Sequence, residues 1–218
     1  MDLDDTLIPS EAIYRRCYAA CDVNPDSPEF VAAKKDVKQL LPRRHVSSHN
    51  RLLYTKRYLE RTGGFSAKTV LEMMHAYEST LVEEVARHWR ELERPRLFAT
   101  LSRKYRLILV TNETTRTQML KLSAIDPSGT IFPTVVCSED VGVEKPEQAI
   151  FLAAMERSVV APEVCLAVGN NFATDLDPCI RMGMRAVLTV EFPCESEVPP
   201  VNILKICQLD QLLEVLEL

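Results

Sequence analysis

The chain has 218 residues and 46% of them are hydrophobic, which suffices for one α/β domain with a smaller accessory element. Its 26 Lys and Arg residues are outnumbered by 31 Asp and Glu residues, so the formal charge is −5. Because no long basic run could follow a phosphate backbone, a nucleic acid partner is not expected.

Seven cysteines are scattered along the chain without a CxxC pair, a pattern that predicts neither a disulfide framework nor a zinc site. No apolar stretch approaches the ~20 residues that a membrane span needs, and the N-terminus lacks a basic region followed by an apolar one. We therefore expect a cytoplasmic protein that binds no membrane and is a monomer or a homodimer.

Residues from about 10 to 92 are expected to be helical, because apolar residues recur there at helical spacing. The clearest pattern follows Ser66, after which apolar side chains recur at every third or fourth position as far as Trp89. Such stripes need packing partners, so the segment predicts a small helical bundle. The expected N-caps of its helices are Ser10, Ser27, either Ser47 or Ser48, and Ser66.

After Pro95, short β-branched runs alternate with helical stretches, which is typical of successive βαβ units with a parallel sheet. We predict a doubly wound α/β core of five or six strands from residues 1–9 and 93–218, with a helical domain of residues 10–92 inserted into it. The expected strands are 107–111, 134–137, 165–169 and 186–190, and the expected helices are 115–123, 146–157, 174–182 and 209–216, with a further apolar run at 202–206.

Polar residues stand at the carboxyl ends of three of these strands, where open parallel sheets place ligand sites. Thr111 and Asn112 follow the first strand. Lys145 lies in the loop after the second strand, and Asn170 follows the third. If the acidic segment that begins at Asp2 ends a further, central strand, all four segments converge on one crevice.

These segments resemble the four ordered motifs of the haloacid dehalogenase superfamily. Residues 2–7 match its DxDxTL signature, and Thr111 stands at the Thr or Ser that closes the second motif. Lys145, within Glu-Lys-Pro, is similar to the third motif, and residues 169–175 are similar to the fourth, GDxxxxD. The helical segment 10–92 is similar to the four-helix cap of one phosphatase-type subgroup.

The resemblance implies a Mg²⁺-dependent phosphatase, similar to nucleotidases and sugar-phosphate phosphatases, that acts on a small phosphorylated metabolite. Asp2 would attack phosphorus and form an aspartyl-phosphate, while Asp4 would serve as general acid and base. Mg²⁺ would be bound by Asp2, the backbone carbonyl of Asp4, Asn170 and Asp175. The substrate phosphoryl group would be bound by Thr6, Thr111, Asn112 and Lys145, of which Thr111 and Lys145 also take part in catalysis.

Two features depart from the family pattern. Asn170 stands where a metal-binding aspartate is usual, so one formal charge is lost and weaker Mg²⁺ binding is expected. Asp175 could instead cap the following helix. A buried strand ordinarily leads into the first aspartate, and we expect such a strand upstream of Met1 in a longer form of the chain.

The segment 43–51 of the expected cap concentrates cationic and hydrogen-bonding side chains. Arg44, His45 and Asn50 are candidates for recognising a leaving group or a second phosphate. The alternative is a solvated loop between helices.

Two rival functions stay open at this point. A haloacid dehalogenase attacks carbon and needs no metal, but Asp4 argues against it because displacement of halide requires no protonation. A catalytically weak binding or regulatory protein of the same fold is suggested by Asn170 and by the short stretch that precedes Asp2.

Overall fold

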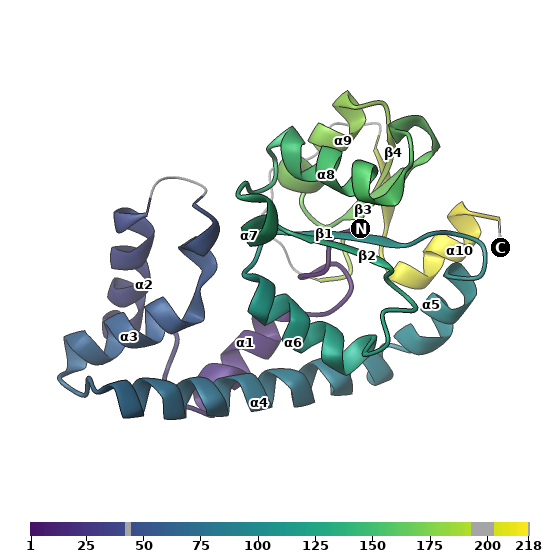
Figure 1. Ribbon diagram of the computed structural model, residues 1–218. Helices are drawn as coiled ribbons and strands as arrows, with labels where there is room; N and C mark the ends of the chain where they lie inside the picture. Colours follow the sequence, from purple (N-terminus) through teal and green to yellow (C-terminus); the bar gives the residue numbers. More distant parts are fainter. Residues whose placement is uncertain (42–44, 193–202, 218) are drawn as a thin grey trace.

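The computed structural model describes residues 1–41, 45–192 and 203–217, and it contains an α/β core from which a pair of helices projects (Figure 1). Among the described residues, five strands run parallel in two groups. The first group pairs β1 (Ile108–Thr111) with β2 (Thr134–Cys137), and the second has the order β3 (Leu166–Gly169), β4 (Arg185–Thr189) and β5 (Leu204–Ile206).

The first residues of the chain join the two groups of strands. The backbone N–H of Val110 donates to the carbonyl of Met1 (2.9 Å), and the N–H of Asp2 donates to the carbonyl of Val168 (3.0 Å). Residues 1–2 therefore lie between β1 and β3, and the order across the sheet is β2, β1, residues 1–2, β3, β4, β5. This position places Asp2 at the centre of the sheet. The strand expected upstream of Met1 stays a prediction.

Helices cover both faces of the sheet, which confirms the predicted doubly wound α/β architecture (Figure 1). Because successive strand residues point to opposite faces, Leu109 packs with Phe98 on one face and Val110 packs with Ile150 on the other. The face of Val110 carries α8 (Gln148–Ser158) and α9 (Asp177–Arg181), and the face of Leu109 carries α5 (Arg94–Leu101), α6 (Thr115–Ile125) and α10 (Leu212–Val215).

Four α-helices lie within the described part of the segment between residues 10 and 91. Two of them, α2 and α3, pack side by side and project away from the sheet, whereas α4 runs along α6 (Figure 1). At the end of α4, Trp89 stacks on Phe98 with 5.0 Å between ring centroids, so this helix joins the projecting part to the core. The four are α1 (Ser10–Ala19), α2 (Pro28–Leu40), α3 (Arg51–Thr62) and α4 (Ala67–Glu91).

Two of the predicted N-caps are confirmed. The side chain of Ser27 accepts a hydrogen bond from the N–H of Phe30, and that of Ser66 accepts one from the N–H of Thr69. Ser10 is instead the first residue of α1, because the chain turns into the helix one residue earlier than the sequence indicated.

The N-cap predicted for the third helix is wrong. Ser47 and Ser48 lie in a short 3-10 helix (Val46–His49), and α3 begins after it. The side chain of Asn50 caps α3 by accepting a hydrogen bond from the N–H of Leu52 (2.9 Å). Asn and Ser are equally good caps, so residue type alone could not separate the two starting points.

Other differences concern short elements. The helix α5 was not predicted, because Pro95 was read as the end of the helical segment, although proline is tolerated in the first turn of a helix. The helix expected from residue 146 begins at Gln148. The expected helix 174–182 is a π-helical turn (Phe172–Leu176) followed by α9, and the short helix α7 (Ser138–Val141) lies where a loop was expected.

None of the helices in the described ranges combines the length and the apolar character that crossing a bilayer requires.

Candidate active site

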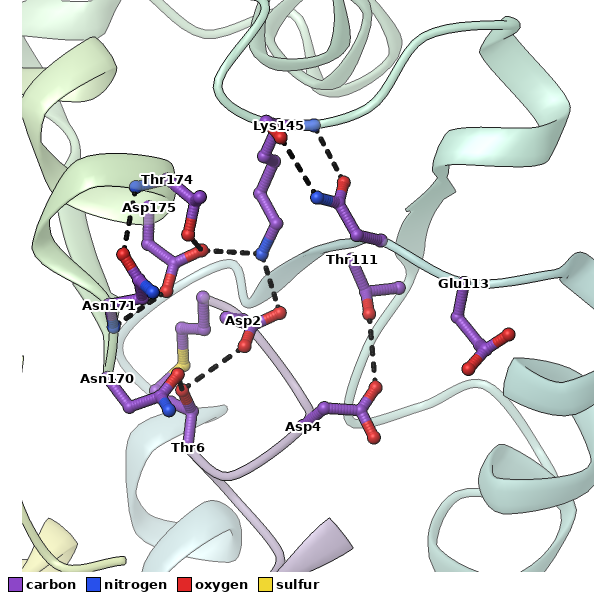
Figure 2. Close-up of polar contacts among 12 residues, drawn as sticks. Asp2, Asp4, Thr6, Thr111, Glu113, Lys145, Asn170, Asn171, Thr174 and Asp175 are labelled. Carbon is purple, nitrogen blue, oxygen red and sulfur yellow. Dashed lines mark hydrogen bonds and ion pairs between the residues drawn. The ribbon is translucent and has the colours of Figure 1, made fainter. Parts of the chain in front are cut away.

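Asp2 and Lys145 form a buried ion pair at the carboxyl end of the sheet (Figure 2). The Lys145 Nζ atom lies 2.7 Å from Asp2 Oδ1 and 2.7 Å from Asp175 Oδ1. All three residues are at most 8% exposed. One ammonium group therefore faces two carboxylates, and the trio carries an excess of negative charge when both carboxylates are ionised.

Asp2 and Lys145 both have shifted pKa values in this trio. Burial raises the pKa of the Asp2 carboxyl to about 7, with Lys145 opposing this shift and Asp175 adding to it. Burial alone would lower the pKa of the Lys145 ammonium, but the carboxylates of Asp175 and Asp2 raise it well above its ordinary value. Lys145 is therefore a permanent cation and hydrogen-bond donor here, and a bound cation would further favour the ionised form of Asp2.

The side chain of Asn112 fixes the loop that carries Lys145. Its Nδ2 donates to the carbonyl of Lys145 (3.0 Å), and its Oδ1 accepts from the N–H of Lys145 (2.7 Å). The loops that follow β1 and β2 are thus joined directly. Asn112 was expected to bind phosphate through its backbone N–H, and that role stays a prediction beside the side-chain role seen here.

Asp175 is held against the end of β3 by its own loop. Its Oδ2 accepts from the N–H of Asn171 (3.0 Å), and its Oδ1 accepts from the hydroxyl of Thr174 (3.3 Å). A Cβ atom at Gly169 would lie only 2.5 Å from the Asp175 Cβ, so the carboxylate can approach the strand only because this position is glycine. Asp175 therefore stabilises its loop and also pairs with Lys145.

A set of oxygen atoms surrounds the hydroxyl group of Thr6. Thr6 Oγ1 lies 3.3 Å from Asp2 Oδ2 and 3.1 Å from Asn170 Oδ1 (Figure 2). Among the described residues, no three His, Cys, Asp or Glu side chains are arranged to hold a metal ion. A divalent ion here would therefore depend on the amide oxygen of Asn170 beside the Asp2 carboxylate, a donor set of hard oxygens that fits Mg²⁺.

The carboxylate of Asp4 points toward β1, away from the Lys145 side of the site (Figure 2). It accepts hydrogen bonds from the hydroxyl of Tyr14 (2.9 Å), the amide of Gln118 (2.8 Å) and the hydroxyl of Thr111 (3.5 Å). It also forms an ion pair with the ammonium group of Lys121. Burial would raise the pKa of Asp4, but the charge of Lys121 and the hydrogen bonds from Lys121, Ser10 and Gln118 together outweigh burial and hold the pKa well below its ordinary value.

Lys121 and Gln118 were missed by the sequence analysis. Both side chains are fully buried, and they lie three residues apart on α6, where they share one face of the helix. The positions 118, 121, 122 and 125 follow the spacing of a buried helical stripe, and Leu122 and Ile125 are its apolar members. A lysine and a glutamine within such a stripe were the available signal.

The predicted cap residues have local contacts in this structure. His45 Nδ1 accepts from the N–H of Ser47 (3.1 Å), and Asn50 caps α3 as described above. Arg44 lies outside the described residues. The role of these three residues in substrate recognition stays a prediction.

Two residues close to His45 and Asn50 in the sequence contact buried glutamates of the core. Arg51 lies 3.0 Å from Glu113, which follows Asn112, and His49 lies 3.4 Å from Glu144, which precedes Lys145. Glu113 and Glu144 are 2% and 5% exposed, so the core presents two buried carboxyl groups to Arg51 and His49, directly beside two site residues. Neither glutamate was singled out from the sequence.

Comparison with known proteins identifies the family. The haloacid dehalogenase-like hydrolases match residues 1–183, and the chain belongs to this family. Over 119 residues it is 34% identical to the glyceraldehyde 3-phosphate phosphatase of Methanothermobacter thermautotrophicus, covering 54% of this chain and 52% of that protein. The chain thus matches about half the length of this relative. It is also 28% identical to the ribulose-1,5-bisphosphate 5-phosphatase of Halopiger xanaduensis, over 86% of this chain and 82% of that protein.

Solved structures share the fold over the full chain. The magnesium-bound HAD-hydrolase YfnB of Bacillus subtilis has a TM-score of 0.65 at 22% identity, covering 100% of this chain and 96% of that chain. A 2-haloacid dehalogenase from Pseudomonas syringae has a TM-score of 0.70 at 23% identity, covering 99% of this chain and 96% of that chain. At such identities the likeness concerns the fold alone.

Proposed function

We propose that the chain is a phosphomonoester hydrolase that acts on a small phosphorylated metabolite through an aspartyl-phosphate on Asp2. The observation that carries this proposal is the buried carboxylate of Asp2 at the centre of the sheet, with the Lys145 ammonium 2.7 Å away. The names of the relatives support it, because they are phosphatases of phosphorylated sugars. By this analogy a sugar phosphate is the preferred substrate class.

In the proposed reaction, an Asp2 oxygen attacks phosphorus and the bond to the leaving oxygen breaks. Asp4 is ionised beside Lys121 in the absence of substrate, so it must take up a proton as the substrate dianion binds. It passes this proton to the leaving oxygen and later removes a proton from the water that hydrolyses the aspartyl-phosphate. Lys145 and the hydroxyl of Thr111 offset the charge of the transferring oxygens. Bound Mg²⁺, held by Asp2, Asn170 and the carbonyl of Asp4, would add positive charge at the same oxygens.

A cytoplasmic location, a monomeric or homodimeric state and the Mg²⁺ dependence belong to the same proposal. Asp175 enters it as a partner that fixes Lys145 and is itself bound by its own loop, and its role as a Mg²⁺ ligand stays a prediction. Dehalogenation is the weaker alternative, because Asp4 adds an acid that halide release does not require.

The test is hydrolysis of p-nitrophenyl phosphate and a panel of sugar phosphates by the purified chain with added Mg²⁺. Asp2→Asn should lower turnover by roughly 10³-fold or more, because an amide is a far poorer nucleophile than a carboxylate. Asp5→Asn makes the same chemical change three residues away and should retain most of the activity. Turnover that is lost in neither variant, or absent in the unmodified chain, would contradict the proposal.

A further inference from the structure

Two of the three aspartates at the start of the chain, Asp2 and Asp4, each pair with a buried lysine. Lys145 pairs with Asp2 and comes from the loop after β2, whereas Lys121 pairs with Asp4 and comes from α6. The Lys145 pair was expected from the sequence. The Lys121 pair has no role in the reaction as described so far.

The orientation of the Asp4 side chain depends on the polar residues that contact it. Asp4 forms an isolated β-bridge with Ile8 and directly precedes a turn that begins at Asp5, which has a positive φ of 51°. The Asp4 side chain is 23% exposed, while that of Lys121 is 0% exposed. Lys121 therefore contacts Asp4 from the interior and is screened from any substrate by it.

Two neighbours tie this pair to the rest of the site. Gln118 Nε2 lies 2.8 Å from Asp4 Oδ2 and also 2.8 Å from Thr111 Oγ1, so one amide sets the spacing between the proposed acid and a proposed phosphate ligand. Tyr14 in α1 accepts a hydrogen bond from Lys121 (2.6 Å) and donates one to Asp4 (2.9 Å). The carboxylate is thus oriented from α6 and from the first helix of the inserted segment.

We propose that Lys121 is a positioning residue that holds the Asp4 carboxyl group where it can exchange a proton with the leaving group. The proposal rests on the phosphatase function proposed above. Lys121 is fully buried and can influence the substrate only through Asp4. Its effect should therefore appear only in the step in which Asp4 takes part. That step is the transfer of a proton to the leaving oxygen, which matters for a poor leaving group and little for a good one.

The test compares an alkyl phosphate with p-nitrophenyl phosphate. An alkoxide needs a proton to leave, whereas p-nitrophenolate leaves without one. Lys121→Met, which keeps the length of the side chain, should lower kcat for the alkyl phosphate by about tenfold or more relative to kcat for p-nitrophenyl phosphate, with similar KM values. Lys121→Arg restores a cation and should recover much of the alkyl phosphate rate.

Three further variants separate positioning from general damage. Arg116→Met removes another cation from α6, one whose partner is Glu78 rather than Asp4, and should leave the ratio of the two rates unchanged. In an Asp4→Asn background, Lys121→Met should change the ratio no further, because the residue through which it acts is already altered. Tyr14→Phe removes one donor to Asp4 and should shift the ratio in the same direction by a smaller factor.

Parallel losses on both substrates in Lys121→Met, or no loss, would overturn the positioning role while leaving the proposed function intact. If Lys121→Met does not fold, an unchanged ratio in Tyr14→Phe would overturn it. An unmodified chain that hydrolyses neither phosphate refutes the proposed function, and the positioning role falls with it.

Discussion

The side chain of Asn112 and the backbone of Lys145 form two reciprocal hydrogen bonds, of 3.0 and 2.7 Å, across the carboxyl ends of β1 and β2. These bonds fix the backbone of Lys145 against the residue that follows β1 (Figure 2). The geometry of the ion pair with Asp2 therefore depends on a residue that does not touch Asp2 itself.

The first prediction concerns this bridge. Asn112→Ala should destabilise the fold by about 1–3 kcal/mol, because it removes two hydrogen bonds and leaves the partners on Lys145 unsatisfied. The same variant should lower kcat, since Lys145 loses its support. Urea unfolding and steady-state kinetics check the two effects, and Asn112→Asp serves as the control that keeps the acceptor to the Lys145 N–H. A variant with unchanged stability and kcat would show that the bridge is dispensable.

The second prediction concerns the close approach at Gly169. Gly169→Ala should displace Asp175, because the added Cβ would lie 2.5 Å from the Asp175 Cβ and 2.7 Å from its Oδ2. We expect a lower melting temperature and at least a tenfold loss of kcat, at a cost of about 1–3 kcal/mol for overpacking. Gly64→Ala is the control, because Gly64 has no positive φ and its added Cβ would meet only the flexible end of the Leu59 side chain, at 3.3 Å. Equal behaviour of the two variants would contradict the argument from close approach.

The third prediction concerns the contact between cap and core. Arg51 and Glu113 are both buried, and the Arg51 guanidinium also lies 4.3 Å from the ring centre of Tyr14. Arg51→Met or Glu113→Gln alone should destabilise the protein by about 3–5 kcal/mol, because each leaves a buried partner without its counter-charge.

The double variant supplies the control for this pair. Combining Arg51→Met with Glu113→Gln should cost clearly less than the sum of the single variants, since no uncompensated charge remains. Chemical denaturation of the three variants measures the coupling. Strictly additive effects would mean that the two residues act independently.

The fourth prediction concerns the metal-binding oxygens. Asn170→Asp adds a carboxylate beside Asp2, so the concentration of Mg²⁺ that gives half-maximal activity should fall by about tenfold. The same variant should bind Mg²⁺ more tightly in calorimetry, which reports on the site without turnover. Asn171→Asp adds the same charge one residue further along and is the matched control. A Mg²⁺ requirement that is unchanged in Asn170→Asp would argue against metal binding at Asn170.

Much of the fold could be predicted because its signals are local. Alternating β-branched runs and helices identified the doubly wound core, and the four expected strands between residues 107 and 190 differ from the observed ones by at most one residue at either end. The π-helical turn at Phe172–Leu176 and the helix α5 depend on packing between distant segments, which local sequence patterns do not show. Asn50 became the cap of α3 because a 3-10 helix occupies the preceding residues.

The residues of the candidate site likewise fall into two groups, those that the sequence predicted and those that only the structure shows. Asp2 and Lys145 were selected because short motifs mark them, and the structure places them 2.7 Å apart. Lys121 belongs to no sequence motif. Its pairing with Asp4 becomes visible only in the structure, where α6 packs beside the first turn of the chain. Glu113 likewise becomes informative only because Arg51, far away in sequence, lies against it. Helical spacing can indicate that a charged residue is buried. It cannot identify the partner of that residue when the partner lies in a distant segment, because the pairing depends on tertiary packing.

The central claim is that Asp2 itself accepts the phosphoryl group. The most direct measurement is rapid acid quenching during turnover of p-nitrophenyl phosphate, followed by borohydride reduction and mass spectrometry of the N-terminal peptide. The account predicts homoserine at position 2 in the unmodified chain and none in Asp2→Asn. Trapped phosphate on another residue, or turnover that persists in Asp2→Asn, would contradict it.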